Sequence, residues 1–363
     1  MKKFSENNSL ISRIKSIRQN VVNKKSKDYN IALDKPVSHW IKEDRLLNEI
    51  GKEFTIILRT RGCSWALGDS GGCSMCGYIT DSNIKPVKSE DIIRQFDFAV
   101  EQKINEIKSS QENFILKIFN SGSFFDDEEI TEQVRNHIYE VIKSIDKIKE
   151  VVVESRVEFI DLTKLKKMKE ILDDKYIEIA IGLETVDDYI RNNYINKGLL
   201  YDDFLKAVDL CKKLRLGIRV YLLFKAPFLN EQAAIDDCIN SVNKLIKLQV
   251  DTISINPINI QRGSFLEYLW YQKRYRPPWF YSLIKALKKV LLNKKKTVPI
   301  RIISDPSGAG TKRGIHNCLK KECNENMLSL LRKFVLTQDV NELVKEVPEC
   351  ECKLQYKLKK IYL

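Results

Sequence analysis

Short apolar runs alternate with segments of helical periodicity along most of this 363-residue chain. The runs are rich in β-branched residues and predict strands, whereas the segments between them carry apolar residues three or four positions apart and predict amphipathic helices. Predicted strands occupy residues 55–60, 114–122, 151–155, 177–184, 218–224 and 252–258, and a seventh follows at 299–304. Strict alternation of this kind is typical of parallel strands joined by crossover helices, so we expect an α/β fold.

Repeated strand–helix units suit a partial or complete TIM-like (β/α) barrel, with its chemistry at the C-terminal ends of the strands. A doubly wound open sheet is the alternative, but neither a GxGxxG nor a Walker sequence follows the first strand, which favours the barrel. We place the barrel at residues 51–304. Residues 1–50 predict an irregular and helical, basic N-terminal extension. Residues 305–363 lose the alternation and contain four cysteines, so we expect a small C-terminal cysteine-rich module there.

Composition narrows the class of protein. Hydrophobic residues make up 43% of the chain and charged residues 31%, which allows a sizeable core and argues against global disorder. The sequence has neither a run of about 18 apolar residues nor a signal-peptide core, so we expect a cytoplasmic protein without a membrane partner. The net charge of +13 is compatible with a nucleic-acid partner, with Lys24, Lys25 and Lys27 as candidate phosphate contacts. A general richness in lysine is the alternative explanation.

Three of the nine cysteines lie in one glycine-rich loop directly after the first predicted strand. Cys63, Cys73 and Cys76 follow a C-x9-C-x2-C spacing, and the glycines around them leave backbone N–H groups free to bond sulfur. Three thiolates do not complete a four-ligand zinc site, but they fit a [4Fe–4S] cluster that keeps one iron open for a substrate or cofactor. A zinc site that borrows its fourth ligand from elsewhere is the alternative.

A cluster loop at the end of the first strand of a (β/α) barrel resembles the radical S-adenosylmethionine (SAM) superfamily. The usual superfamily spacing is C-x3-C-x2-C, and this loop departs from it. The longer first gap resembles the branch that contains the elongator catalytic subunit and RaSEA, the radical SAM protein of archaeosine biosynthesis. The resemblance spans roughly residues 40–363 and includes the segments NSGSFFDDEEI, ESRVEFI, IGLETVDDYIRNNYINKG and NPINIQRGSFLEYLWYQKRYRPPWFYS.

The resemblance implies roles for residues at the strand ends. The three cysteines would hold the cluster, and SAM bound at its open iron would be cleaved to a 5′-deoxyadenosyl radical. The candidate SAM-binding residues are Ser121, Gly122 and Ser123 for the amino group, and Glu154 and Arg156 for the ribose hydroxyls and the carboxylate. The candidate catalytic residues are Glu184 and Lys225. The structural alternatives are a turn that caps a helix at Asp126, a buried Glu154–Arg156 ion pair and an exposed lysine at position 225.

An aromatic stretch later in the chain is a candidate RNA contact. Tyr268, Trp270, Tyr271 and Tyr275 are interleaved with lysine and arginine, the residue types that stack on bases and pair with phosphates. Packing of these aromatic rings against the barrel is the alternative.

Four further cysteines form two close pairs in the C-terminal module. Cys318 and Cys323 make a C-x4-C pair, and Cys350 and Cys352 make a C-x-C pair. Brought together, they could close a tetrahedral zinc site that pins the module onto the barrel. Free, partly exposed cysteines are the alternative.

RaSEA-type proteins are implied to act on tRNA with a lysine-transferring partner subunit. The partner attaches lysine to a 7-cyano-7-deazaguanine base in the D-loop, and the radical enzyme then breaks the carbon–nitrogen bond at the end of the attached lysine. The resemblance therefore implies a tRNA-modifying C–N lyase of archaeosine synthesis, served by an unidentified electron donor. The alternatives are another elongator-type radical SAM enzyme that modifies tRNA, and a non-catalytic RNA-binding protein that contains zinc.

Overall fold

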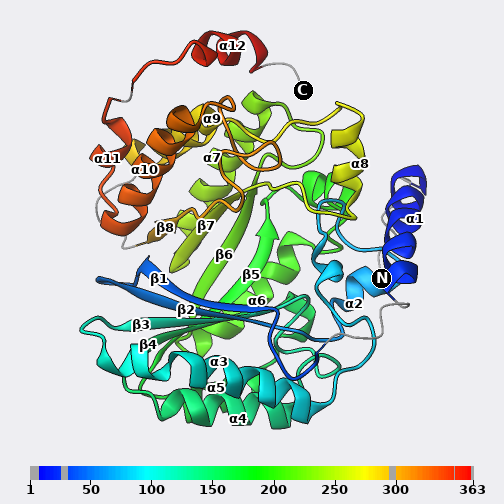
Figure 1. Ribbon diagram of the computed structural model, residues 1–363, viewed down its shortest axis with the longest axis vertical. Helices are drawn as coiled ribbons and strands as arrows, with labels where there is room; N and C mark the ends of the chain where they lie inside the picture. The colour runs from blue at the N-terminus through cyan, green and yellow to red at the C-terminus, as the bar shows by residue number, and fades with distance from the viewer. Residues whose placement is uncertain (1–7, 26–31, 294–299, 347, 361–363) are drawn as a thin grey trace.

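One curled eight-stranded sheet forms the centre of the protein (Figure 1). The computed structural model describes residues 8–25, 32–293, 300–346 and 348–360. The strands pair in chain order; β1 is antiparallel to β2, and every later neighbouring pair is parallel. Their bounds are β1 Ser38–Arg45, β2 Ile50–Leu58, β3 Phe114–Asn120, β4 Ile148–Glu154, β5 Tyr176–Glu184, β6 Gly217–Phe224, β7 Thr252–Pro257 and β8 Arg301–Ile303.

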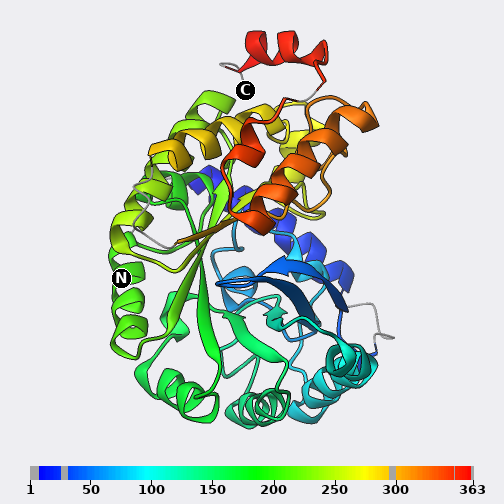
Figure 2. The ribbon, with the colours of Figure 1, turned by 90° about the vertical axis from the view of Figure 1, so that its left-hand side faces the viewer.

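Helices cover the outer face of the sheet (Figure 2). Helix α3, for example, buries Ile92, Phe96 and Ala99, which recur at helical spacing and lie in the main core. The longer helices that alternate with strands are α3 Ser89–Ser109, α4 Glu132–Lys143, α5 Leu162–Ile171, α6 Tyr201–Lys213, α7 Glu231–Leu248 and α9 Phe280–Asn293. The others are α1 Asn8–Lys25, α2 Ser64–Leu67, α8 Phe265–Tyr271, α10 Lys321–Thr337, α11 Asn341–Val344 and α12 Cys352–Lys359. The expected α/β alternation is confirmed.

The barrel is partial, with β1 and β8 as its two edge strands. Side chains span the gap between these edges. The Arg301 guanidinium donates to the Arg45 carbonyl over 3.0 Å, and Lys42 of β1 forms an ion pair with Asp305, which follows β8. The sequence predicted a partial or complete TIM-like barrel, and the structure has the partial form.

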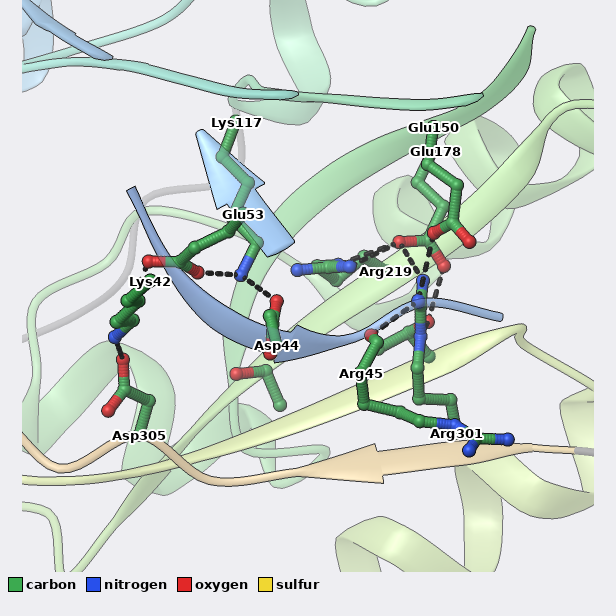
Figure 3. Close-up of polar contacts among 12 residues, drawn as sticks. Lys42, Asp44, Arg45, Glu53, Lys117, Glu150, Glu178, Arg219, Arg301 and Asp305 are labelled. Carbon is green, nitrogen blue, oxygen red and sulfur yellow. Dashed lines mark hydrogen bonds and ion pairs between the residues drawn. The ribbon is translucent and has the colours of Figure 1, made fainter. Parts of the chain in front are cut away.

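Buried ion pairs fill the interior near the N-terminal ends of the strands (Figure 3). Lys117 Nζ lies 2.6 Å from Asp44 Oδ2 and also pairs with Glu53. On the other side, Glu178 accepts from Arg219 and Arg301, each over 2.8 Å. Each buried charge has an opposite partner, which offsets part of the cost of removing it from water. The buried ion pairs thus occupy one end of the barrel interior. The candidate functional residues lie at the other end, where the parallel strands terminate.

One sequence expectation is wrong in the N-terminal region. Residues 38–45 were expected to be irregular or helical, but they form β1. The strand SHWIKEDR lacks an apolar alternation because Lys42 and Asp44 pair with charged groups of β2, β3 and the segment after β8. A strand that buries ion pairs carries no hydrophobic signature of period two.

None of the described helices is both long and apolar enough to cross a membrane. Lys27, one of the candidate phosphate contacts, lies outside the described residues. Lys24 is exposed at the end of α1.

Candidate functional site

The loop with the first three cysteines leaves the C-terminal end of β2 and is held by residues 194–198, which follow β5. Asn196 Nδ2 donates to the carbonyls of Ser70 (3.0 Å) and Gly72 (2.8 Å), and the indole N–H of Trp65 donates to the Asn196 carbonyl over 2.8 Å. Gly198 packs so closely on Trp65 that a Cβ would lie 2.3 Å from the ring. Residues 195–198 therefore fix the conformation of the cysteine loop by direct contact.

Helix α1 clamps the same loop from the other side. Arg18 is 4% exposed, and its guanidinium donates to the carbonyls of Gly71 (3.0 Å) and Cys76 (2.7 Å). Lys25 donates to the Thr80 carbonyl. Sequence reasoning missed Arg18, because nothing local distinguishes it from the other basic residues of the N-terminal region.

An ion pair lies next to the cysteine loop. Lys197 Nζ is 2.7 Å from Glu184 Oε1, and both side chains are largely buried. Burial lowers the pKa of Lys197, but Glu184 and then Cys73 outweigh it, so the pKa is raised on balance. Burial raises the pKa of Glu154 to about 7, with Lys197 opposing the shift and Glu184 adding to it. The structure therefore brings the candidates Glu154 and Glu184 together around one ammonium group.

Arg156 joins this group from the segment after β4. Its guanidinium donates to the Lys197 carbonyl over 3.1 Å and lies 5.2 Å from the centre of the Trp65 ring. Its ion pair is with Glu158. The expected alternative of a buried Glu154–Arg156 pair is therefore wrong. A small pocket beside these side chains is lined by Glu154, Arg156, Gly182 and Lys197, among others.

The loop after β3 is organised by a carboxylate that sequence reasoning missed. Glu129 is 4% exposed and accepts from Thr60 Oγ1 (2.6 Å), Asn120 Nδ2 (2.9 Å) and the Ser123 N–H (2.8 Å). A Cβ at Gly122 would lie 1.7 Å from Glu129 Oε1, so a larger residue there would displace this carboxylate from its hydrogen bonds.

The other candidates in this loop can now be placed. Ser121 and Gly122 directly follow β3, and the hydroxyl of Ser123 accepts from the Arg156 N–H over 3.1 Å. The expected alternative of a turn capping a helix at Asp126 is wrong, because α4 begins at Glu132 after Thr131.

Lys225 lies in a different environment from the other candidates. It is only 2% exposed, so the exposed-lysine alternative is wrong. Its ammonium lies 2.8 Å from Glu231 Oε1 and donates to the Arg276 carbonyl over 2.9 Å. Glu184 is the last residue of β5 and Lys225 directly follows β6. Both have a positive φ of 68°, a conformation that costs a non-glycine residue energy and is common at functional sites. Lys225 thus tethers the segment 275–279 to the end of β6.

The three loop thiols lie close enough to affect one another electrostatically. Burial raises the pKa of all three, that of Cys73 to about 11. Nearby cations oppose the shift: Arg156 acts on Cys63, Lys197 on Cys73 and Arg18 on Cys76. A site that places one cation near each of these partly buried thiols suits ligands that bind as thiolates.

The C-terminal cysteines are packed more tightly. The Sγ atoms of Cys318, Cys323, Cys350 and Cys352 all lie within 4.8 Å of one another, and among the described residues they are the one such group suited to a single metal ion. The three loop cysteines do not form such a compact group of ligand atoms. Their donor set fits a three-cysteine [4Fe–4S] cluster better than a single zinc ion.

The aromatic stretch divides between core and surface. Tyr275 is buried and donates its hydroxyl hydrogen to the Lys225 carbonyl over 2.6 Å, and Trp270 is partly buried beneath the Arg313 guanidinium. Tyr271 remains 69% exposed. Packing on the barrel, the structural alternative, therefore accounts for part of this segment.

Comparison with known proteins establishes the class. The model of the radical SAM superfamily matches residues 57–238. The chain belongs to the radical SAM superfamily, whose members are enzymes that use a [4Fe–4S] cluster and SAM. This confirms the resemblance, and membership of the superfamily implies the iron–sulfur cluster and SAM that were expected from it.

Several relatives share nearly the whole chain. An uncharacterized protein of Methanocaldococcus jannaschii is 41% identical over 94% of this chain and 90% of its own length. Proteins named archaeosine synthase subunit beta from Methanosarcina acetivorans and Thermococcus kodakarensis are each 36% identical. They cover 96% and 88% of this chain and 95% and 96% of their own.

Solved structures show weaker likeness. Elp3 of Methanocaldococcus infernus has a TM-score of 0.47 and 14% identity, and covers 67% of this chain and 59% of that one. SuiB of Streptococcus suis has a TM-score of 0.47 and 15% identity, and covers 85% of this chain and 57% of that one.

Proposed function

We propose that this radical SAM enzyme modifies tRNA as the radical subunit of an archaeosine synthase. Its substrate would be a lysine adduct of a 7-deazaguanine base in the D-loop. The bond that breaks joins the lysine side chain to its terminal nitrogen, which stays with the base. The observation that carries this proposal is the 36% identity, over 96% of the chain, with a protein named archaeosine synthase subunit beta.

The residues at the barrel mouth have roles consistent with this reaction. Cys63, Cys73 and Cys76 would hold the cluster, which when reduced supplies the electron for reductive cleavage of SAM. The cations Arg156 and Lys197 would pair with the SAM carboxylate. The pocket they line with Glu154 is partly shielded from water, which strengthens such charge pairing.

Further candidates are assigned by their neighbours. Carbonyls at Ser121 and Gly122 would accept from the SAM ammonium, while Ser123 and Glu129 keep that loop in place. Glu154 would accept from ribose hydroxyls. Glu184 orients Lys197 through their ion pair and remains the proposed catalytic residue at the end of β5. We assign Lys225 to positioning rather than catalysis, because its ammonium is engaged by Glu231 and the Arg276 carbonyl.

A zinc ion is proposed for the C-terminal module. Four zinc–sulfur bonds of about 2.3 Å in tetrahedral geometry place the sulfurs about 3.8 Å apart. The Sγ atoms of Cys318 and Cys350 lie 3.9 Å apart, and those of Cys323 and Cys352 3.8 Å apart. The ligands cluster with Trp279, Tyr281 and Tyr356. The ion would therefore hold the module against the start of α9.

Partner proteins complete the proposal. A lysine-transferring subunit would prepare the substrate, in keeping with the word "subunit" in the names of the relatives. An electron donor would reduce the cluster, since none of the twenty ordinary side-chain types is a strong reductant.

Two measurements test the function. Anaerobically reconstituted protein should cleave SAM to 5′-deoxyadenosine, and tRNA from a strain without this protein should lack archaeosine and accumulate the lysine adduct by mass spectrometry. Loss of a different nucleoside would favour the elongator-type alternative. A protein that binds tRNA but cleaves no SAM would favour the non-catalytic alternative, and normal archaeosine in the deletion strain would refute the proposal.

A further inference from the structure

Helices α1 and α8 pack side by side next to the cysteine loop (Figure 1). Ile14 of α1 lies in one apolar cluster with Phe265 and Leu266 of α8, and the exposed Arg13 guanidinium stands 4.4 Å from the centre of the Tyr268 ring. Because Arg18 of α1 also holds the cysteine loop, the outer surface of these two helices continues directly from the proposed active site.

This surface is strongly basic. Helix α1 carries five lysine and arginine residues and no aspartate or glutamate. Arg13, Lys15 and Lys24 of α1 are exposed, and so is Arg262, whose backbone touches the cysteine loop at Gly77. Helix α8 is followed by the exposed Lys273 and Arg274. A surface of one charge sign attracts a polyanion and orients it.

A row of aromatic rings runs from the loop after β5 across to α8. Neighbouring ring centres are 5.6 Å apart for Tyr189 and Tyr194, 5.4 Å for Tyr194 and Phe228, 6.2 Å for Phe228 and Phe265, and 6.0 Å for Phe265 and Tyr268. Tyr189 is 63% exposed and Phe228 39%, and Tyr271 at the end of α8 is 69% exposed. Tyr194 and Tyr268 are half-buried and Phe265 is buried, so they support the exposed rings of Tyr189 and Phe228 from below. Large apolar rings left exposed on a supported surface point to a binding surface.

We infer that this surface, defined by Arg13, Lys15, Arg262, Phe228, Tyr189 and Tyr271, binds an RNA with unpaired bases. The cations would contact successive phosphates, and the exposed rings would stack on bases that are out of the duplex. Exposed aromatic rings interleaved with arginine and lysine are the features that unpaired RNA requires, whereas a charge-only surface would suffice for a duplex backbone. The inference deepens the proposed function, on which it rests for the identity of the RNA.

The test separates charge from stacking in the full-length reconstituted protein, with an unmodified tRNA transcript as the probe. Arg13→Glu with Lys15→Glu should lower the slope of log affinity against log salt by roughly two units. The matched control is Lys108→Glu with Lys166→Glu, which changes two exposed lysines on the outer helices α3 and α5 and should leave the slope nearly unchanged.

Stacking is tested at Tyr271. Tyr271→Ala should weaken binding about 5- to 100-fold, while Tyr271→Phe should restore it, because only the ring is needed. The affinity for inorganic polyphosphate, which has no bases, should be unchanged by Tyr271→Ala.

The outcomes distinguish this inference from the proposed function. If wild-type protein binds the transcript and the α1 and Tyr271 variants bind as well as the control pair, the surface assignment is overturned while the proposed function stands. Equal affinity for polyphosphate, or for vesicles of anionic lipid, would also overturn it. If the deletion strain keeps its archaeosine while the variants lose transcript binding, the surface stands and the proposed function fails. Circular dichroism and a thermal unfolding midpoint like those of the wild type verify the fold of each variant.

Discussion

Lys197 and Glu184 form an ion pair of 2.7 Å between the segment after β5 and the end of that strand. The Lys197 ammonium opposes the rise that burial causes in the pKa of Cys73, and the Glu184 carboxylate adds to the rise in the pKa of Glu154. One contact thus joins the cysteine loop to the SAM pocket proposed beside it.

Replacing this lysine should separate cluster binding from SAM cleavage. In Lys197→Met, Glu184 loses its cation and the stability of the protein should fall by about 1–3 kcal/mol. Formation of 5′-deoxyadenosine should drop at least tenfold, while iron content after reconstitution stays near that of the wild type. Lys206→Met, which removes an exposed ion pair on α6, should change neither quantity. Wild-type rates in Lys197→Met would contradict the assigned role.

Each cysteine of the loop should be needed for the cluster. Cys63→Ala, Cys73→Ala and Cys76→Ala should each lose bound iron and SAM cleavage, because two thiolates hold a cubane cluster poorly. The barrel should remain folded, as circular dichroism would show. Cys211→Ala removes a buried thiol of α6 and is the control. Full activity in any one loop variant would remove that residue from the ligand set.

The pH dependence of stability should reveal Glu154. Burial raises its folded pKa to about 7, above the value of about 4.3 in an unfolded peptide. Between these values the folded state binds more protons, so the contribution of Glu154 to stability is fully present below about pH 4 and is lost as the pH rises through about 7. The measurement is the free energy of unfolding in urea, made on SAM-free protein. The value for the wild type, relative to that for Glu154→Gln, should therefore decrease from pH 5 to pH 8. A constant difference would mean that Glu154 titrates normally; Glu170→Gln, an exposed change on α5, is the comparison.

Arg18 should control how firmly the cysteine loop is held. Arg18→Met removes two hydrogen bonds to loop carbonyls and should cost about 2–3 kcal/mol of local stability. We expect faster iron loss to a chelator, followed by absorbance near 400 nm. Gln19→Met, its exposed neighbour on α1, should lose iron at the wild-type rate. Equal rates for both variants would show that the clamp does not protect the cluster.

The C-terminal cysteines should bind about one zinc ion independently of the iron. Zinc measured by elemental analysis should persist in Cys63→Ala but fall in Cys352→Ser, which should also lower the thermal unfolding midpoint. A closed four-thiolate site has no open position, so SAM cleavage should be affected only as far as the module is loosened. Zinc-free protein of normal thermal stability would end this assignment.

The sequence predicted those parts of the fold that depend on residues close together in the chain. The seven parallel strands were found because each is a buried apolar run, and the cysteine loop because its thiols are close in sequence. β1 was missed because its inward side chains are charged, as with Lys42 and Asp44. Arg18 was missed because its partner Gly71 lies 53 residues away. Glu129 was missed because its contact with Thr60 spans 69 residues. Contacts of that range leave no periodic trace in a single sequence.

The clamps on the cysteine loop come from widely separated parts of the chain. Arg18 precedes the loop, Asn196 follows it by more than a hundred residues, and Gln261 accepts from the Gly77 N–H. During synthesis the loop therefore emerges long before its later supports exist. We expect the iron–sulfur cluster to be inserted only after β7 and Gln261 have left the ribosome. The cluster would then be delivered to a nearly complete barrel.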